Sequence, residues 1–422
     1  MLKYLFLLGI MGEWVFFLFL SLFRLEYAGA QNSNLYTYFW ILIFSATTIA
    51  LIVYLLNYIK KGTFPKFFIL KVSPIIFVIL LYLISFLLNG FDNNANGYYA
   101  SIFFAMCIPA YLIGLICTSL SKENQLINIV VNFVLLGSII LILSLVRLIT
   151  GGGANDSLDT IGGVGRLGIG YLATHFFIVT FYLFLFSNKL SDVFKSTLKP
   201  NNRWLWFIYL LLAIQLATVI FSGSRGPLLN LVIISIVMVI TKVFQKNIIE
   251  SIKKIAVLII LAFSFFLLYN IFGSNYFSTS TERTLTLFQL NESNWAGGSG
   301  RESIYPLALK MFEEKPIFGY GPLGFLSESN LQMHPHNLIL EGLVDYGIVG
   351  AVFIVIFLFY ILKRYSNAIK SNVNILLIFF LFISTLLELQ VSGTFMAHAR
   401  FWFFIGLSIG FTNRKDNKIE RV

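Results

Sequence analysis

Apolar runs of bilayer-spanning length recur along the whole sequence and restrict the structures that it can form. Within hydrocarbon every backbone N–H and C=O needs an internal partner, so such runs predict transmembrane helices. The composition agrees, because 58% of the 422 residues are hydrophobic and only 12% are charged. We therefore expect an all-α polytopic membrane protein, a single integral membrane domain over residues 1–422 with about 12 transmembrane helices. The expected spans are Tyr4–Phe23, Leu35–Ile59, Phe67–Leu88, Tyr98–Leu120, Leu126–Ile149, Leu167–Phe186, Trp204–Phe221, Pro227–Phe244, Ile255–Ile271, Asn337–Leu362, Val373–Leu389 and Thr394–Phe411.

Basic residues are distributed unequally between the two sides of these spans. When both termini are placed in the cytoplasm, every inner loop contains at least one Lys or Arg, and Lys predominates there. The basic residues on the other side are mostly Arg. The positive-inside rule favours this orientation, which leaves most of the net charge of +11 on the cytoplasmic side. The charge therefore requires no nucleic-acid partner.

One long polar segment, Phe272 to His336, interrupts the apolar pattern between the ninth and tenth expected spans. It is rich in Gly, Ser, Thr and Asn, and the favoured orientation makes it a large extracytoplasmic loop. Because long irregular segments on a rigid scaffold often carry function, we expect a site on this side. Arg suits such a site, since a guanidinium binds phosphate or carboxylate through two parallel hydrogen bonds. The alternative is that these arginines only anchor the protein at the membrane interface.

A tight outer turn is predicted at Ser222–Pro227, between the seventh and eighth spans. Gly223 and Gly226 permit the turn, and Pro227 suits the first positions of a helix. Arg225 then lies at a helix N-terminus, where free N–H groups and the helix dipole favour an anion. We expect Arg225 to bind phosphate; the alternative is an Arg that reaches up to lipid headgroups.

Gly300–Phe312 predicts a short amphipathic helix within the polar segment. Apolar side chains recur on one face of it with helical spacing. They are Ile304, Leu307, Ala308, Met311 and Phe312. We expect this face to lie on the rim of the bundle, with Arg301 at the start of the helix as a second anion-binding group. The alternative for Arg301 is an ordinary solvated charge.

Two histidines, His334 and His336, flank a proline directly before the tenth span. Asn337, Glu341 and Asp345 follow at intervals of four residues, so they share one helix face. Acidic groups at membrane depth face a cavity or a partner rather than lipid. We therefore expect His336 to be functional, while the alternative for either histidine is ordinary packing.

Two further arginines are weaker candidates: Arg166, in a glycine-rich stretch before the sixth span, and Arg400, close to His398. His175, inside the sixth span, is expected to be a packed helix residue. The sequence contains no Walker motif, no zinc-ligand spacing and no nucleophile elbow. We therefore expect no cofactor and no metal ion.

Four motifs in a fixed order together resemble the O-antigen ligase and O-antigen or capsular polysaccharide polymerase superfamily of bacterial envelope proteins. They are the glycine-rich turn with Arg166, the Ser224-Arg225-Gly226 turn, Gly300-Arg301 leading to Gly319-Tyr320-Gly321, and His336-Asn337 followed by Leu340, Gly347 and Gly350. The resemblance implies an all-helical fold of the membrane glycosyltransferase (GT-C) type in the bacterial cell (inner) membrane. It also implies undecaprenyl-pyrophosphate-linked glycans as substrates, which a polymerase joins to one another and a ligase transfers to lipid A-core.

The chemistry that the resemblance implies fits these residues. Pyrophosphate leaves as an anion, so metal-independent glycosyl transfer needs no carboxylate pair of the kind found in glycosidases. It needs positive charge for the leaving group, here Arg225 and Arg301, and one base for the acceptor hydroxyl, here His336. The expected catalytic residues are His336, Arg225 and Arg301, and the expected substrate-binding residues are Arg166, Arg225, Arg301, Asn337, Glu341 and Arg400.

The function expected from the sequence is polymerisation of lipid-linked repeat units into O-antigen or capsular polysaccharide on the outer face of the membrane. An O-antigen ligase is the alternative within the superfamily, and nothing in the sequence separates the two. A transporter or flippase of lipid-linked oligosaccharide is a further alternative, although such proteins typically contain repeated halves and broken helices. The expected partners are the glycan donor, the glycan acceptor and the lipid bilayer. A chain-length regulator and a flippase of the same pathway are further candidate partners.

Overall fold

The computed structural model describes residues 66–89, 99–120, 123–149, 160–161, 164–190, 202–243, 301–329 and 334–411, together with residue 331 and scattered positions between 42 and 60. The expected spans Tyr4–Phe23 and Ile255–Ile271, most of Leu35–Ile59, the polar residues 272–300 and both termini lie outside the described residues.

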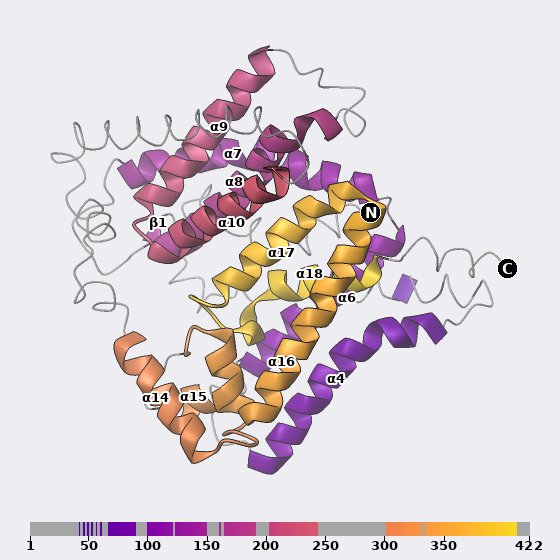
Figure 1. Cartoon of the computed structure of the whole chain (residues 1–422), viewed down its shortest axis with the longest axis vertical. Coiled ribbons are helices and arrows are strands. Elements are labelled where there is room, and N and C mark those ends of the chain that lie inside the picture. The colour runs from indigo at the N-terminus through magenta and orange to yellow at the C-terminus, as the bar shows by residue number, and fades with distance from the viewer. Residues whose placement is uncertain are drawn as a thin grey trace.

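The described residues are helical almost throughout (Figure 1). Among them, 5 helices are long and apolar enough to cross a membrane, and shorter apolar helices accompany these. Every expected span within the described residues corresponds to an apolar helix, which confirms an all-helical, multi-pass membrane protein. The elements are α4 (Lys66–Asn89), η1 (Phe103–Cys107), α6 (Ile108–Leu120), α7 (Glu123–Ile149), β1 (Thr160–Ile161), β2 (Val164–Gly165), α8 (Arg166–Leu190), α9 (Asn202–Phe221), α10 (Arg225–Val243), α14 (Arg301–Glu314), α15 (Gly324–Glu328), α16 (Leu338–Ser371), η2 (Val373–Ile375), α17 (Leu376–Glu388), η3 (Phe395–Ala397) and α18 (Ala399–Gly410).

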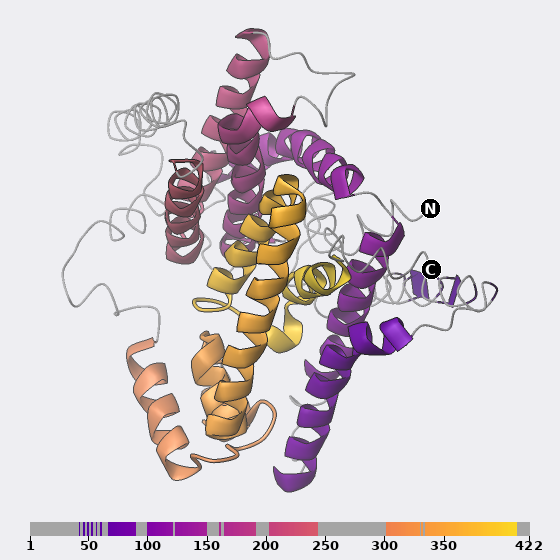
Figure 2. The same cartoon turned by 45° about the vertical axis from the view of Figure 1, so that its right-hand side comes forward.

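Helix α8 lies at the centre of the described bundle. It contacts α7, α9, α10 and α17, and residues 169–186 are buried inside the protein, whereas Leu167 is exposed. Helices α14 and α15 lie together at one end of α16, far from α9, in both views of the molecule (Figures 1 and 2). Residues 169–186 of α8 thus have no lipid-facing side, so polar groups among them meet protein rather than hydrocarbon.

Helix α18 packs directly against α6 through glycines. A Cβ on Gly114 of α6 would collide with the backbone of Phe403, and one on Gly406 of α18 would collide with the backbone of Tyr111. Small residues at such crossings allow two backbones to approach closely, which is a common source of helix association in membranes. The crossing fixes the position of α18, whose first turn carries Arg400.

Helix α16 is broken at Gly347, where the backbone has φ 65° and ψ −162°. A Cβ at this position would collide with the carbonyl group of Ile317 in the loop that follows α14. The same loop pairs with the break, since the Ile348 N–H donates to the Pro316 carbonyl at 2.8 Å. The break therefore attaches α14 and its loop to the start of α16.

Candidate functional site

The turn between α9 and α10 brings Arg225 to the start of a helix. Helix α9 ends at Phe221, Gly223 adopts φ 63°, and α10 begins at Arg225. Arg225 is half-buried. Its position matches the helix start that the sequence predicts, at the positive end of the α10 dipole.

Gly170, near the start of α8, lets this turn pack closely against that helix. A Cβ on Gly170 would lie 2.8 Å from both the Cγ of Pro227 and the Oγ of Ser222. The Thr174 hydroxyl, one turn further along α8, donates to the Pro227 carbonyl at 3.2 Å. Arg166 is the first residue of α8, directly after the β1–β2 pair. The start of α8 therefore supports the start of α10.

Helix α14 begins at Arg301 and packs on its predicted apolar face. Ile304, Ala308 and Met311 are buried in a cluster with Phe325 of α15 and Val344 of α16. The half-buried Arg301 donates from Nη2 to the Val391 carbonyl at 2.5 Å. Among the described residues, no carboxylate forms an ion pair with this guanidinium. Its charge is thus held in place by a neutral partner.

His336 lies immediately before α16, in the left-handed region of backbone conformation at φ 52°. Its imidazole is hydrogen-bonded to the backbone of Gly393, and its Nδ1 is buried without a hydrogen-bond partner among the described residues. Burial, and after it the positive charge of Arg301, lowers the pKa of His336 below 6.5. The ring is therefore neutral at pH 7.

His334 has a different environment. Its ring packs edge-on against Tyr99, with 4.6 Å between the ring centroids. Burial and the neighbouring His336 lower the pKa of His334 to about 4. These contacts are those of a packed aromatic group rather than of a group poised to meet a substrate.

The three predicted motifs meet at one turn, residues 389–394, which joins α17 to η3. Arg301 donates to the Val391 carbonyl, and His336 bonds to the Gly393 backbone. A Cβ on Gly226, directly after Arg225, would lie 3.4 Å from a methyl group of Val391. Segments far apart in the sequence thus bring Arg301, the neutral imidazole of His336 and the backbone next to Arg225 to the same turn.

The start of α16 fixes this turn from the other side. The Leu338 N–H donates to the Leu389 carbonyl at 3.1 Å, and the Thr394 hydroxyl donates to Glu341. Asn337 caps the helix, because its side chain accepts from Ile339 N and Leu340 N, each at 3.0 Å. Asn337 and Glu341 therefore hold the site together through bonds within the protein.

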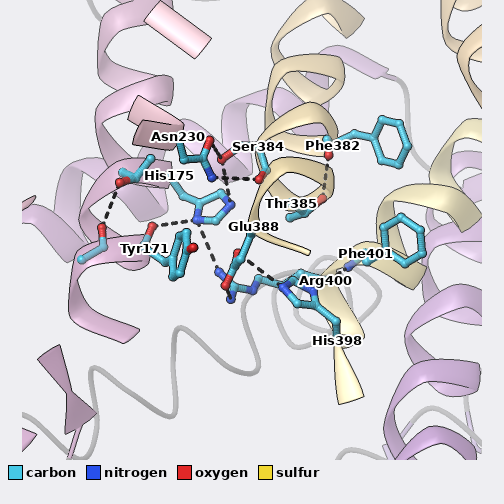
Figure 3. A network of polar contacts seen from close by, with 12 residues as sticks. Tyr171, His175, Asn230, Phe382, Ser384, Thr385, Glu388, His398, Arg400 and Phe401 are labelled. Carbon is cyan, nitrogen blue, oxygen red and sulfur yellow. Dashed lines mark hydrogen bonds and ion pairs between the residues drawn. The ribbon is translucent and has the colours of Figure 1, made fainter. Parts of the chain in front are cut away.

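A buried polar cluster lies beneath the turn, centred on Glu388 (Figure 3). Arg400 pairs with one carboxylate oxygen of Glu388 at 3.1 Å, and His398 contacts the other at 3.3 Å. Arg400 Nη1 also lies 3.3 Å from Nδ1 of His175. On the far side, Ser384 donates to Asn230 at 3.1 Å. The charge of Arg400 is thus largely compensated by Glu388, unlike that of Arg301.

Tyr171 joins the polar cluster to the turn. Its side chain is only 2% exposed, and its hydroxyl has no hydrogen-bond partner among the described residues. It lies within electrostatic range of Glu388, Arg301 and Arg400. A Cβ on Gly226 would lie 2.5 Å from the Tyr171 oxygen. This hydroxyl therefore points at the place where Arg301 and the start of α10 come together.

Sequence reasoning missed Glu388, Tyr171 and Asn230, and it assigned His175 only to packing. Glu388 carried a usable signal, since an acid within an apolar span marks a functional or paired group. Tyr171 carried none, because an aromatic residue in an apolar helix is ordinarily part of the core.

An apolar cavity lies between α4, α16 and α18, close to the same turn. Its lining includes Val78, Phe353 and Trp402. Leu338 and Phe395, which directly flank the site, also line it. The cavity thus adjoins residues next to the polar site and offers an apolar surface suited to a hydrocarbon chain.

Comparison with known proteins places these residues in a family context. Residues 208–355 match a family model described as O-antigen ligase, whose members are membrane enzymes that transfer glycans as ligases or polymerases in polysaccharide synthesis. A search of curated proteins found no match. The matched stretch runs from α9 into α16 and contains Arg225, Arg301 and His336. The resemblance to the O-antigen ligase family is thereby confirmed over residues 208–355.

Proposed function

We propose that this protein is a polysaccharide polymerase that joins undecaprenyl-pyrophosphate-linked repeat units on the outer face of the membrane. The observation that carries this proposal is the approach of Arg301, His336 and Gly226, which directly follows Arg225, to residues 389–394. Two cations beside one neutral base are the groups that glycosyl transfer from a lipid pyrophosphate requires. The adjoining apolar cavity offers a place for the polyprenyl chain.

In the proposed reaction, an acceptor hydroxyl attacks the anomeric carbon of the donor sugar while the bond from that carbon to the pyrophosphate oxygen breaks. The hydroxyl proton passes to the neutral imidazole of His336. Arg225 and Arg301 stabilise the departing pyrophosphate. We also predict that four further residues contact the glycan: Arg166, Asn337, Glu341 and Arg400. Asn337, Glu341 and Arg400 would first have to give up hydrogen bonds that they make within the protein.

An O-antigen ligase is the second candidate, and the description of the matching family model favours it. The two activities differ only in the acceptor. Purified protein supplied with lipid-linked repeat units alone should form longer lipid-linked glycans if it is a polymerase. A requirement for lipid A-core would instead identify a ligase, and movement of unchanged substrate across a vesicle membrane would identify a flippase.

The arginines provide the direct test of the mechanism. Arg225→Lys and Arg301→Lys should each abolish most glycan laddering, because an ammonium group cannot reproduce the paired hydrogen bonds of a guanidinium to phosphate. Glycan length is read on a gel, with the amount of protein compared by immunoblot. Lys310→Ala is the matched control, since Lys310 is an exposed residue of α14. Normal ladders from both Lys variants would contradict the proposed clamp.

A further inference from the structure

We propose that the Tyr171 hydroxyl is a further substrate-binding group, which donates a hydrogen bond to an oxygen of the donor diphosphate. This inference rests on the proposed function and adds to it a neutral donor on α8, a helix that otherwise serves as the core of the bundle. No family motif in the sequence includes Tyr171, so the proposal depends on the geometry alone.

The Tyr171 hydroxyl lacks a hydrogen-bond partner among the described residues. It is nevertheless fully enclosed. Leaving a buried hydroxyl unpaired costs about 1–3 kcal/mol, and buried polar groups in proteins are almost always paired. The backbone of the same residue is well bonded, since its carbonyl lies 2.7 Å from His175 Nδ1. The helix is thus fixed, and only the hydroxyl lacks a partner.

The position of the Tyr171 hydroxyl also favours contact with the diphosphate. The hydroxyl lies against Gly226, the residue after Arg225, and within electrostatic range of Arg301. It therefore lies beside the backbone of the turn that carries Arg225 and within reach of the charge of Arg301. Glycine at position 226 makes this possible, because a Cβ there would lie only 2.5 Å from the phenol oxygen.

The charged groups around the Tyr171 hydroxyl favour an anionic ligand as well. Arg400 and Glu388 compensate one another at 3.1 Å, whereas Arg301 has no described carboxylate partner. Glu388 acts on the hydroxyl more strongly than Arg301 and Arg400 do, but the formal charges of these three groups sum to +1, which an anionic ligand would balance. A phenol is a neutral donor at pH 7, and its bond to a phosphate oxygen would be charge-assisted. Arg301 can admit that oxygen by exchanging a backbone carbonyl for a charged acceptor.

The test is Tyr171→Phe, which removes only the hydroxyl. We expect the affinity for a polyprenyl diphosphate, measured in nanodiscs, to fall about 10- to 100-fold, the range for a bond to a charged group. Affinity for the matching polyprenyl monophosphate should fall less, because it lacks the second phosphate. Thermal stability should be unchanged or higher, since an unpaired buried hydroxyl is lost.

Tyr82→Phe is the matched control. Tyr82 is also buried with an unpartnered hydroxyl, but it lies on α4 and stacks on Phe103 of η1. Wild-type affinity in the Tyr171→Phe variant would overturn the inference while leaving the proposed function intact. A stability loss that accounts for the weaker binding would overturn it as well, by showing a structural role. If the wild-type protein itself fails to bind polyprenyl diphosphate, the proposed function falls and the inference with it.

Discussion

At the scale of single residues, His336 is held in a state suited to accept a proton. A non-glycine residue in the left-handed region costs about 1–2 kcal/mol, so its neighbours must maintain it. The Gly393 backbone does so through the imidazole, while burial and Arg301 keep the ring neutral. The same arginine that would bind the leaving group thus also prepares the base.

His336→Ala should retain donor binding but reduce glycosyl transfer about 10²–10⁴-fold, because the acceptor proton then has no receiver. Transfer is measured by single turnover of lipid-linked glycan with the purified protein. His334→Ala is the control and should have the milder effect, since that ring packs against Tyr99. Near-normal transfer by His336→Ala would refute the assignment of the base.

The pH dependence of kcat/KM should follow the lowered pKa of His336. The ring cannot accept a proton once it is protonated, so activity should fall with decreasing pH along a limb centred below pH 6.5. Arg301→Gln removes a charge that lowers this pKa, so the residual activity should show the limb at higher pH. Arg301→Lys keeps the charge and should leave the limb in place. If the limb stays at the same pH in Arg301→Gln, the charge of Arg301 does not lower the pKa of the catalytic group.

At the scale of elements, the break in α16 fixes the position of Arg301 relative to His336. The segment before Gly347 carries Asp345, which accepts from Leu323 N at 2.9 Å and Phe325 N at 3.2 Å and so fixes the start of α15. The residues after α14 pair with the break itself. Arg301 is therefore positioned by the same helix whose first residues follow His336.

Gly347→Ala should destabilise the protein strongly. The φ of 65° alone costs about 1–3 kcal/mol for a residue with a Cβ, and the methyl group would also collide with Ile317. Thermal unfolding in detergent measures the loss. Gly342→Ala is the matched control on the same helix, because its methyl group would meet only the end of the flexible Ile354 side chain. Equal stability of the two variants would show that the break is not needed.

At the scale of the whole molecule, local signals predicted the helices and the motifs but not their meeting point. Run length and turn chemistry are properties of neighbouring residues, so the spans, the turn before Arg225 and the apolar face of α14 were accessible. The site depends on distant pairs: Arg301 and Val391 are separated by 90 positions, and His175 and Arg400 by 225. No local pattern encodes such contacts, which is why Tyr171 emerged only from the structure.

Membrane orientation is the last prediction. Because Gly226, Arg301 and His336 approach the same turn, the start of α10, Arg301 and His336 must lie on one side of the membrane, and the distribution of Lys and Arg predicts that this side is extracytoplasmic. A reporter active only outside the cytoplasm should therefore be active when fused after Asn294 and inactive when fused after Val422. A fusion after Lys195, in a loop expected to be cytoplasmic, serves as an internal control. Activity of a cytoplasmic reporter at Asn294 would put the site on the wrong side for an externally presented glycan, and the proposed function would fail.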